Sequence, residues 1–134
     1  MAIDGGFALR AKRHRDQAER NQEFARHIVD DVPDWSTIIT FYAALHFVDE
    51  YAAALGLSPF GSHGARNGWL IRCKEMRSIA RQYDHLRSYA SIARYNCPPV
   101  GHDVRTPQVV KTRMFSLKAQ VKRCVDLAMR KLES

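Results

Sequence analysis

The chain has 134 residues, of which 46% are hydrophobic and 26% are charged, with a formal net charge of +7. This length predicts a single domain, residues 1–134, whose core is large enough to fold without metal or disulfide support. The three cysteines (Cys73, Cys97 and Cys124) are far apart and form no CxxC pair, which argues against a zinc site or a disulfide framework and favours a reducing cytoplasm. We therefore expect no metal and no cofactor.

Positive charge is concentrated in the second half of the chain. Up to Asp34 there are six Lys and Arg against seven Asp and Glu, whereas Gly61 to Ser134 carries fifteen against five. Such a basic half favours a polyanion, most often nucleic acid, or an acidic protein partner, although a purely solubilising surface gives the same pattern. The N-terminus lacks an apolar signal segment, and His46 and Asp49 interrupt the longest apolar run, so we expect a cytoplasmic protein without membrane contact.

The first predicted helix covers about residues 7–29. Ala11, Ala18 and Ala25 recur every seven residues, so its apolar stripe is narrow and its side chains are small. Mixed charge covers the rest of its surface, which is typical of a peripheral bundle helix with many ion pairs. The segment that leads to Pro33 ends this helix, because the residue before a proline is disfavoured in the α region.

The most apolar stretch of the chain covers residues 34–56 and contains no Lys or Arg. Its apolar residues fall on two adjacent stripes at helical spacing, and a helix with this pattern is normally buried between several others. Asp34 is placed to cap it, and Gly56 is placed to terminate it. The stripes consist of Trp35, Ile38, Ile39, Tyr42 and Leu45, and of Phe41, Ala44, Val48 and Leu55.

Two further helical stretches follow a Gly-rich loop. Residues 65–95 are longer than most globular helices, so we expect a kink or break at Gly68 or near Lys74. The last helix begins with Thr106 as N-cap and Pro107 in the first turn, and continues to the C-terminus. The predicted fold is therefore all-α: an antiparallel up-and-down bundle of four main helices, with room for a short extra helix.

Three phrases occur in a characteristic order: FYAALH at residues 41–46, GSHGAR at 61–66 and YDHLRSYASIARY at 83–95. Together they resemble the HEPN superfamily of small helical bundles. The resemblance implies an up-and-down bundle that often forms a homodimer. Some members are metal-independent endoribonucleases, and others are non-catalytic companions of nucleotidyltransferases or modules that bind RNA or nucleotides.

Catalytic members of that superfamily carry an Arg, a polar residue and then a His, usually on a late helix. In this chain the match is Arg20 followed by Asn21 and His27, which lie on the first helix instead. On the late helix, Arg81 and His85 are one residue closer together than the spacing of this motif requires. This departure favours a non-catalytic role.

A second catalytic arrangement combines two histidines with two arginines. Metal-free RNA cleavage needs a base for the 2′-hydroxyl and a cation for the developing phosphate charge, and His46 or His63 with Arg66 or Arg94 would supply both. Ser91 would share their polar cleft. The alternative for His46 is a core histidine satisfied by a neighbouring hydroxyl or carbonyl.

The remaining candidates are residues that would contact nucleic acid. Two tyrosines near the motif can stack on a base, and cationic side chains on the third and last helical stretches can contact phosphates if those stretches are neighbours. These candidates are Tyr42, Arg72, Arg77, Arg81, Arg87, Tyr95, Lys118 and Lys122. We predict a non-catalytic HEPN-like binding module for RNA or for a nucleotide-associated protein partner. A metal-independent endoribonuclease and a purely structural interaction subunit are the alternatives.

Overall fold

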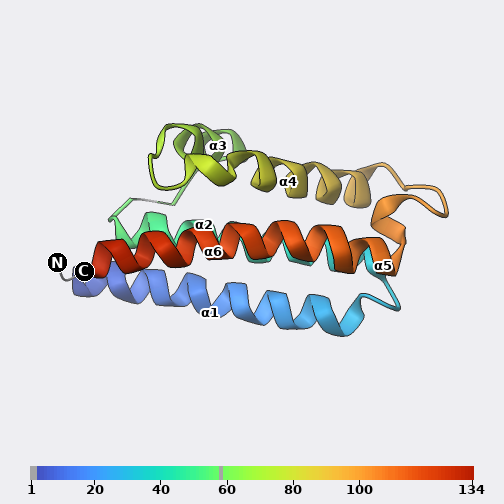
Figure 1. Cartoon of the computed structure of the whole chain (residues 1–134), viewed down its shortest axis with the longest axis horizontal. Coiled ribbons are helices and arrows are strands. Elements are labelled where there is room, and N and C mark those ends of the chain that lie inside the picture. The colour runs from blue at the N-terminus through green and yellow to red at the C-terminus, as the bar shows by residue number, and fades with distance from the viewer. Residues whose placement is uncertain (1–2, 58) are drawn as a thin grey trace.

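The computed structural model describes residues 3–57 and 59–134, and within these residues every regular element is helical (Figure 1). The predicted all-α bundle is confirmed. The elements are α1 (Gly5–Ile28), α2 (Pro33–Ala54), α3 (His63–Arg72), η1 (Arg77–Ile79), α4 (Ala80–Tyr95), η2 (Asp103–Arg105), α5 (Pro107–Val109), η3 (Val110–Met114) and α6 (Phe115–Glu133).

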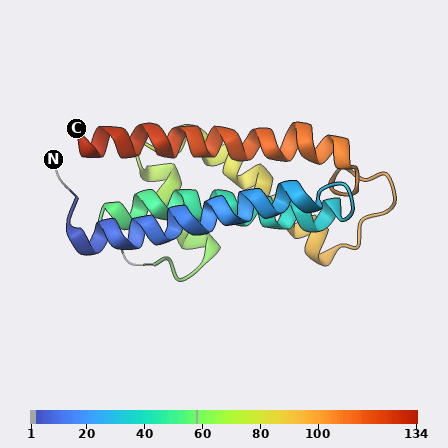
Figure 2. The same ribbon diagram turned by 90° about the horizontal axis from the view of Figure 1, so that it is seen from below.

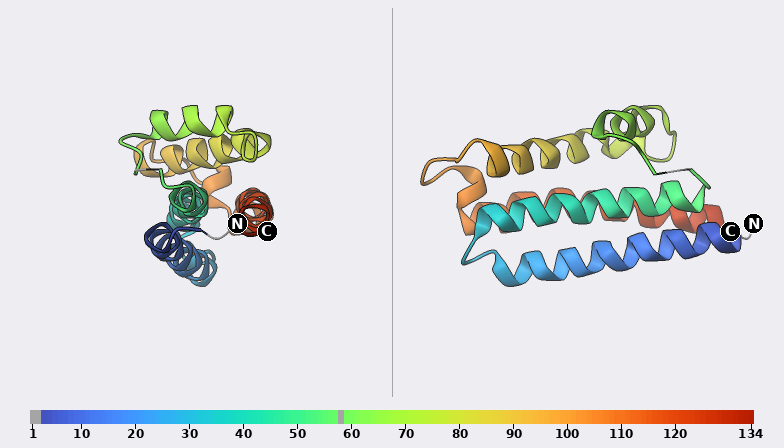
Figure 3. Two further views of the ribbon diagram at one scale, coloured as in Figure 1. Left: turned by 90° about the vertical axis from the view of Figure 1, so that its left-hand side faces the viewer. Right: turned by 180° about the vertical axis from the view of Figure 1, so that it is seen from behind.

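Helix α2 occupies the middle of the bundle and packs against α1, α4 and α6 (Figures 1 and 2). The chain runs up and down through these four long helices, so its two ends lie at the same end of the molecule. Helix α3 differs from the others because it lies across the bundle, above α2 and α4, as the view along the bundle axis shows (Figure 3, left).

Burial of α2 matches its sequence pattern except at the two ends of the predicted stripes, where Trp35 and Leu55 are exposed. Phe41, Phe47 and Val48 are at most 2% exposed, as expected for a helix covered on several sides. Trp35, in contrast, is 57% exposed, so its prediction as part of the buried stripe was wrong. It lies in the first turn of α2, at the rim of the bundle. The cap also differs: Val32 is the N-cap, and Asp34 lies inside the first turn behind Pro33.

Small side chains explain how closely α1 approaches α2. Ala11, Ala18 and Ala25 are all at most 3% exposed, which confirms the predicted narrow stripe. Their size lets the two backbones come together, and the Ser36 hydroxyl of α2 donates a hydrogen bond to the Ala25 carbonyl at 2.9 Å. Gly56, just after α2, has a φ of +83°, and a Cβ there would collide with the Phe7 ring of α1.

The predicted break in the third helical stretch is confirmed near Lys74. Helix α3 ends at Arg72, a turn follows, and α4 begins at Ala80, whereas Gly68 lies inside α3. Because of this break, α3 folds back across the bundle instead of extending α4. Its N-terminal residues thereby come to lie over α2.

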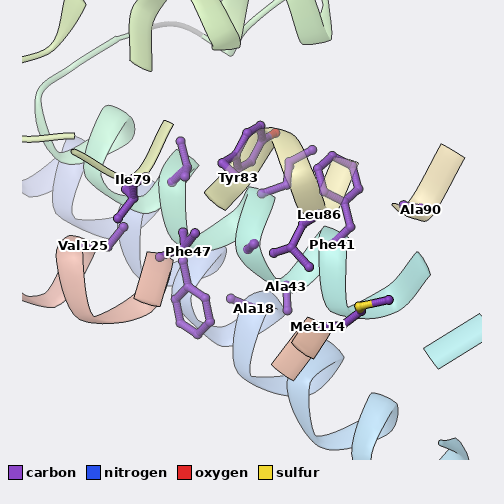
Figure 4. Close-up of a cluster of buried hydrophobic side chains, with 14 of the residues drawn as sticks. Ala18, Phe41, Ala43, Phe47, Ile79, Tyr83, Leu86, Ala90, Met114 and Val125 are labelled. Atoms are coloured by element: carbon purple, nitrogen blue, oxygen red, sulfur yellow. The ribbon is translucent and has the colours of Figure 1, made fainter. Parts of the chain in front are cut away.

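The last helix begins where it was predicted to begin, with Thr106 at the N-cap and Pro107 in the first turn. The Thr106 hydroxyl donates to the His102 carbonyl at 3.2 Å instead of capping the helix. The π-helical turn η3 joins α5 to α6. Side chains from α1, α2, α4, η3 and α6 meet in one apolar core (Figure 4).

Candidate functional site

A buried ion pair connects α2 to α3. Arg66 Nε and Nη2 donate to the two carboxylate oxygens of Asp49 at 2.9 and 3.0 Å. Both side chains are nearly enclosed, with 9% and 12% of their surfaces exposed. Burial opposes the charge of Arg66, but the hydrogen bonds and the charge of Asp49 outweigh it and raise the pKa of Arg66. Its positive charge is therefore neutralised locally.

The Tyr83 hydroxyl lies beside this pair. Tyr83 belongs to α4 and is fully buried, and its hydroxyl marks the edge of the apolar cluster (Figure 4). Among the described residues no group meets the geometry of a hydrogen bond to its oxygen. Burial raises the pKa of Tyr83 well above its ordinary value, while the charge of Arg66 opposes that rise. Tyr83 is therefore a neutral phenol at every physiological pH.

His63 begins α3 and lies among positive charges. Ser62 caps the helix by accepting a hydrogen bond from the Ala65 N–H at 3.0 Å. The His63 ring packs against Phe41, with 5.8 Å between ring centroids, and its Nδ1 is buried without a partner among the described residues. Burial, followed by the charges of nearby arginines, lowers the pKa of His63. Those arginines are Arg66, Arg87 and Arg94.

Arg94 is held in place by two tyrosines. Its Nη1 donates to the Tyr42 hydroxyl at 2.7 Å, and its guanidinium carbon lies 4.9 Å from the centroid of the Tyr95 ring. These contacts fix the guanidinium near the C-terminal end of α4 without neutralising it. Arg87 lies seven residues earlier on α4, and its guanidinium is 3.9 Å from the Asp84 carboxylate, its one ion pair within the described part of the chain.

These residues form what we call the α3–α4 cationic cluster: His63, Arg66, Arg87, Arg94 and Tyr42. Asp49 balances Arg66, so Arg87 and Arg94 provide the excess positive charge. Neutral His63 adds a ring nitrogen that donates or accepts a hydrogen bond. Such a group of guanidinium and imidazole side chains is suited to a phosphate, which arginine binds through two parallel hydrogen bonds.

His46 does not join the cluster. Its Nδ1 lies 3.0 Å from Nδ1 of His14, and the two rings stack with 5.3 Å between centroids, so His46 is directed toward α1. Burial, and then the neighbouring His14, lowers the pKa of His46. The hydrogen-bond contact of His46 is thus with His14, and the charges of Asp49 and Arg66 also act on its ring. Its partner is an imidazole instead of the hydroxyl or carbonyl considered in the alternative. Ser91 is exposed on α4.

The alternative catalytic pair lies on the exposed surface of α1. Arg20 donates to Gln17 at 2.8 Å, and His27 lies 3.3 Å from the Glu23 carboxylate. Both side chains thus have partners within their own helix, and neither contributes to the α3–α4 cationic cluster.

The predicted cationic surface divides into separate parts. Arg72, Arg77 and Arg81 are exposed on α3, η1 and α4, and Arg81 lines a groove between α3 and α4. Lys118, which the sequence offered as a phosphate contact, is only 7% exposed and donates to Gln22 of α1. Lys122 is paired with Asp126 at 2.9 Å. Lys118 thus faces α1, whereas the Lys122 ammonium lies 5.8 Å from the centroid of the Phe47 ring of α2.

Sequence reasoning missed Trp35 as a candidate. This exposed side chain lines a groove together with Tyr42, Arg94 and Tyr95. Its spacing placed it in an apolar stripe. Its exposure could have been predicted from its position in the first turn of α2, where coverage by neighbouring helices ends.

No three His, Cys, Asp or Glu side chains in the described part of the chain are close enough to hold a metal ion together. None of the helices within residues 3–57 and 59–134 is long and apolar enough to cross a bilayer. No protein-family model, curated protein or solved structure matches the chain.

Proposed function

We propose that this chain is a non-catalytic, HEPN-like binding module for RNA, with the α3–α4 cationic cluster as its phosphate-binding site. The observation that carries the proposal is that Arg94 is bonded to Tyr42 while the His63 ring packs on the adjacent Phe41. The charges of Arg87 and Arg94 both act on this imidazole. Because the Asp49 carboxylate is bonded to Arg66, it does not cancel the charge of the two other arginines.

Orientation of Arg94 supports the proposal. An arginine side chain loses rotamer entropy when it binds a phosphate, and this cost falls when its geometry is fixed beforehand. Tyr42 fixes Arg94 through its hydroxyl, and the exposed Tyr95 ring lies against the guanidinium. Arg72, Arg77 and Arg81 add further exposed positive charge on α3, η1 and α4.

Salt dependence of RNA binding tests this proposal. For single strands, the logarithm of the binding constant falls with the logarithm of salt concentration by about 0.7 per phosphate contact. We expect fluorescence anisotropy with a labelled oligoribonucleotide to show a slope of about −2, corresponding to roughly three contacts. In Arg94→Ala or Arg87→Ala the slope should become shallower by about 0.7, the share of one contact.

Arg123→Ala is the matched control because it removes the same charge from an exposed position on α6. It should leave the slope within error of the parent protein. A slope near zero in the parent protein, or equal losses in Arg94→Ala and Arg123→Ala, would refute the cluster as the RNA site and would favour a structural interaction subunit.

A metal-independent endoribonuclease is the second candidate, and the state of His63 favours it. A histidine whose pKa is lowered is available as a base at neutral pH, and Arg94 is available to a developing phosphate charge. Incubation with RNA in the presence of a chelator separates the two functions. Cleavage that survives chelation and is lost in His63→Ala would overturn the non-catalytic proposal. His46→Ala and His27→Ala test the other histidines.

The HEPN resemblance adds a homodimer and a nucleotidyltransferase partner to the proposal. Sedimentation velocity over a range of protein concentrations measures the first. Co-purification of this chain with a co-expressed nucleotidyltransferase tests the second. If no complex forms although RNA still binds, the proposal is restricted to RNA.

A further inference from the structure

A groove of about 380 Å³ lies at the rim of the bundle, where the first turns of α2 meet the last turn of α4. It is lined by Trp35, Ile38, Tyr42, Ala93, Arg94 and Tyr95. Trp35 lies at the start of α2 and Tyr95 lies at the end of α4. The two residues come to the same groove because α2 and α4 run antiparallel (Figure 1).

Two of the three aromatic side chains that line this groove are unusually open to solvent. Trp35 is 57% exposed and Tyr95 is 69% exposed. Large aromatic rings contribute most to stability when buried, so exposing two of them in one groove gives up burial energy that the core would otherwise gain. Ala93 and Ile38 complete an apolar floor between them.

Charge differs sharply between the two sides of Trp35. On one side lies Arg94, whose guanidinium is held between Tyr42 and Tyr95. On the other side a second hollow, also lined by Trp35, contains Asp30, Asp31 and Asp34 together with Arg105, and Asp30 is paired with Lys111 at 2.7 Å, so Asp31 and Asp34 carry most of its negative charge. A ligand with an aromatic part and an anionic part would therefore place its anion toward Arg94 and away from the carboxylates.

We infer that the Trp35–Tyr95 groove binds an unpaired nucleobase of a single-stranded nucleic acid, with the attached phosphate directed toward Arg94 and His63. The inference deepens the proposed function and rests on it. A base has two π-faces and stacks on aromatic side chains without sequence preference, and a neighbouring arginine adds a cation–π contact.

This assignment predicts selectivity for strand type. In a duplex the faces of the bases are stacked on one another and unavailable, whereas in a single strand they can be splayed onto an aromatic surface. The groove therefore distinguishes single-stranded RNA from double-stranded RNA of the same length, although both carry the phosphates that the cationic cluster binds.

Tryptophan fluorescence reports directly on stacking. The chain has two tryptophans, and Trp69 packs against Tyr51 and Phe60 inside the fold, so Trp69→Phe leaves Trp35 as the sole tryptophan. In this background, oligouridylate should quench the emission of Trp35. An abasic phosphodiester of equal length carries the same charge without bases and should bind without quenching.

Affinity measurements on variants complete the test. Trp35→Ala or Tyr95→Ala should weaken binding of the single strand by about 5- to 150-fold, the range found for loss of one stacked base, and should leave binding of the abasic strand unchanged. Trp35→Phe should retain most of the affinity. Phe24→Ala is the matched control, because Phe24 is also exposed, at 53%, but lies on α1.

Each other outcome overturns the inference in a distinguishable way. If oligouridylate and the abasic strand bind with equal, salt-dependent affinity, the inference of a stacking site is refuted, whereas the proposed phosphate site is retained. If the parent protein binds neither strand, both the proposed function and the role of the groove are refuted. If Trp35→Ala abolishes self-association without changing affinity for the single strand, the groove is an interface between two copies of this chain.

Discussion

Arg66 and Asp49 form a nearly enclosed ion pair with two hydrogen bonds, and this pair joins the crossing helix α3 to the central helix α2. Removing one partner leaves a buried charge without compensation, which typically costs about 3–5 kcal/mol. We expect Asp49→Ala to lower the free energy of unfolding by about this amount, measured by urea denaturation.

The double variant Asp49→Leu with Arg66→Met is the control. Because it removes both charges and keeps apolar volume, it should recover most of the lost stability. A loss below about 1 kcal/mol in Asp49→Ala, typical of a solvated surface pair, would contradict the buried role of this contact.

The imidazole pair of His14 and His46 predicts a pH dependence of stability. The folded pKa of His46 is lowered by burial and by His14, whereas the unfolded pKa is about 6.5. Below about pH 6.5 the unfolded chain therefore binds more protons than the folded chain, and stability falls as the pH falls toward the lowered pKa. NMR titration of the His46 ring and urea denaturation at several pH values measure both quantities.

His46→Gln keeps a hydrogen-bonding side chain without a titrating ring and should flatten this part of the stability profile. A His46 ring that titrates at or above the ordinary histidine pKa would contradict the prediction, as would a profile that His46→Gln does not change.

Lys118 is a buried cation that is expected to reduce stability at neutral pH. Burial, and then the charges of Arg26 and Lys122, lowers its pKa to about 8, against about 10.4 in the unfolded chain. Between these values the unfolded chain binds more protons, so stability rises as the pH rises from about 8 to about 10.4.

Replacement by an apolar side chain of similar length tests this effect. Lys118→Met should raise the free energy of unfolding at pH 7 by about 1–3 kcal/mol, and the gain should shrink as the pH approaches 10. Urea denaturation at both pH values measures it. Destabilisation at pH 7 would show that the hydrogen bond to Gln22 outweighs the burial of the charge. RNA affinity should not change, because Lys118 faces α1.

Close packing of α1 against α2 depends on small side chains, and Ala18 is fully buried between them. Ala18→Leu would add three carbon atoms at a contact that has no space for them, which typically costs about 1–3 kcal/mol. Thermal and urea denaturation measure the loss. Glu19→Leu changes the neighbouring exposed position of the same helix and should stay within about 0.5 kcal/mol of the parent. Equal effects of the two variants would contradict the packing argument.

The sequence by itself determined which segments are helical and which helix is central. Apolar spacing identified α2, and alanine spacing identified the contact face of α1. The excessive length of residues 65–95 predicted a break at Gly68 or near Lys74, and the second of these is present. These features are local, because helical periodicity and Pro or Gly punctuation depend on residues close in the chain. The start of the last helix at Thr106 was predictable for the same reason.

Only the tertiary structure decided which polar residues meet. The crossing direction of α3 brings Arg66 to Asp49 and His63 to the arginines of α4, whereas His46 pairs with His14 of α1 on another side of α2. Periodicity also assigns a residue to a helix face without showing where neighbouring helices stop covering that face. For this physical reason Trp35 proved exposed at the rim of the bundle, and Lys118 proved buried beneath α1.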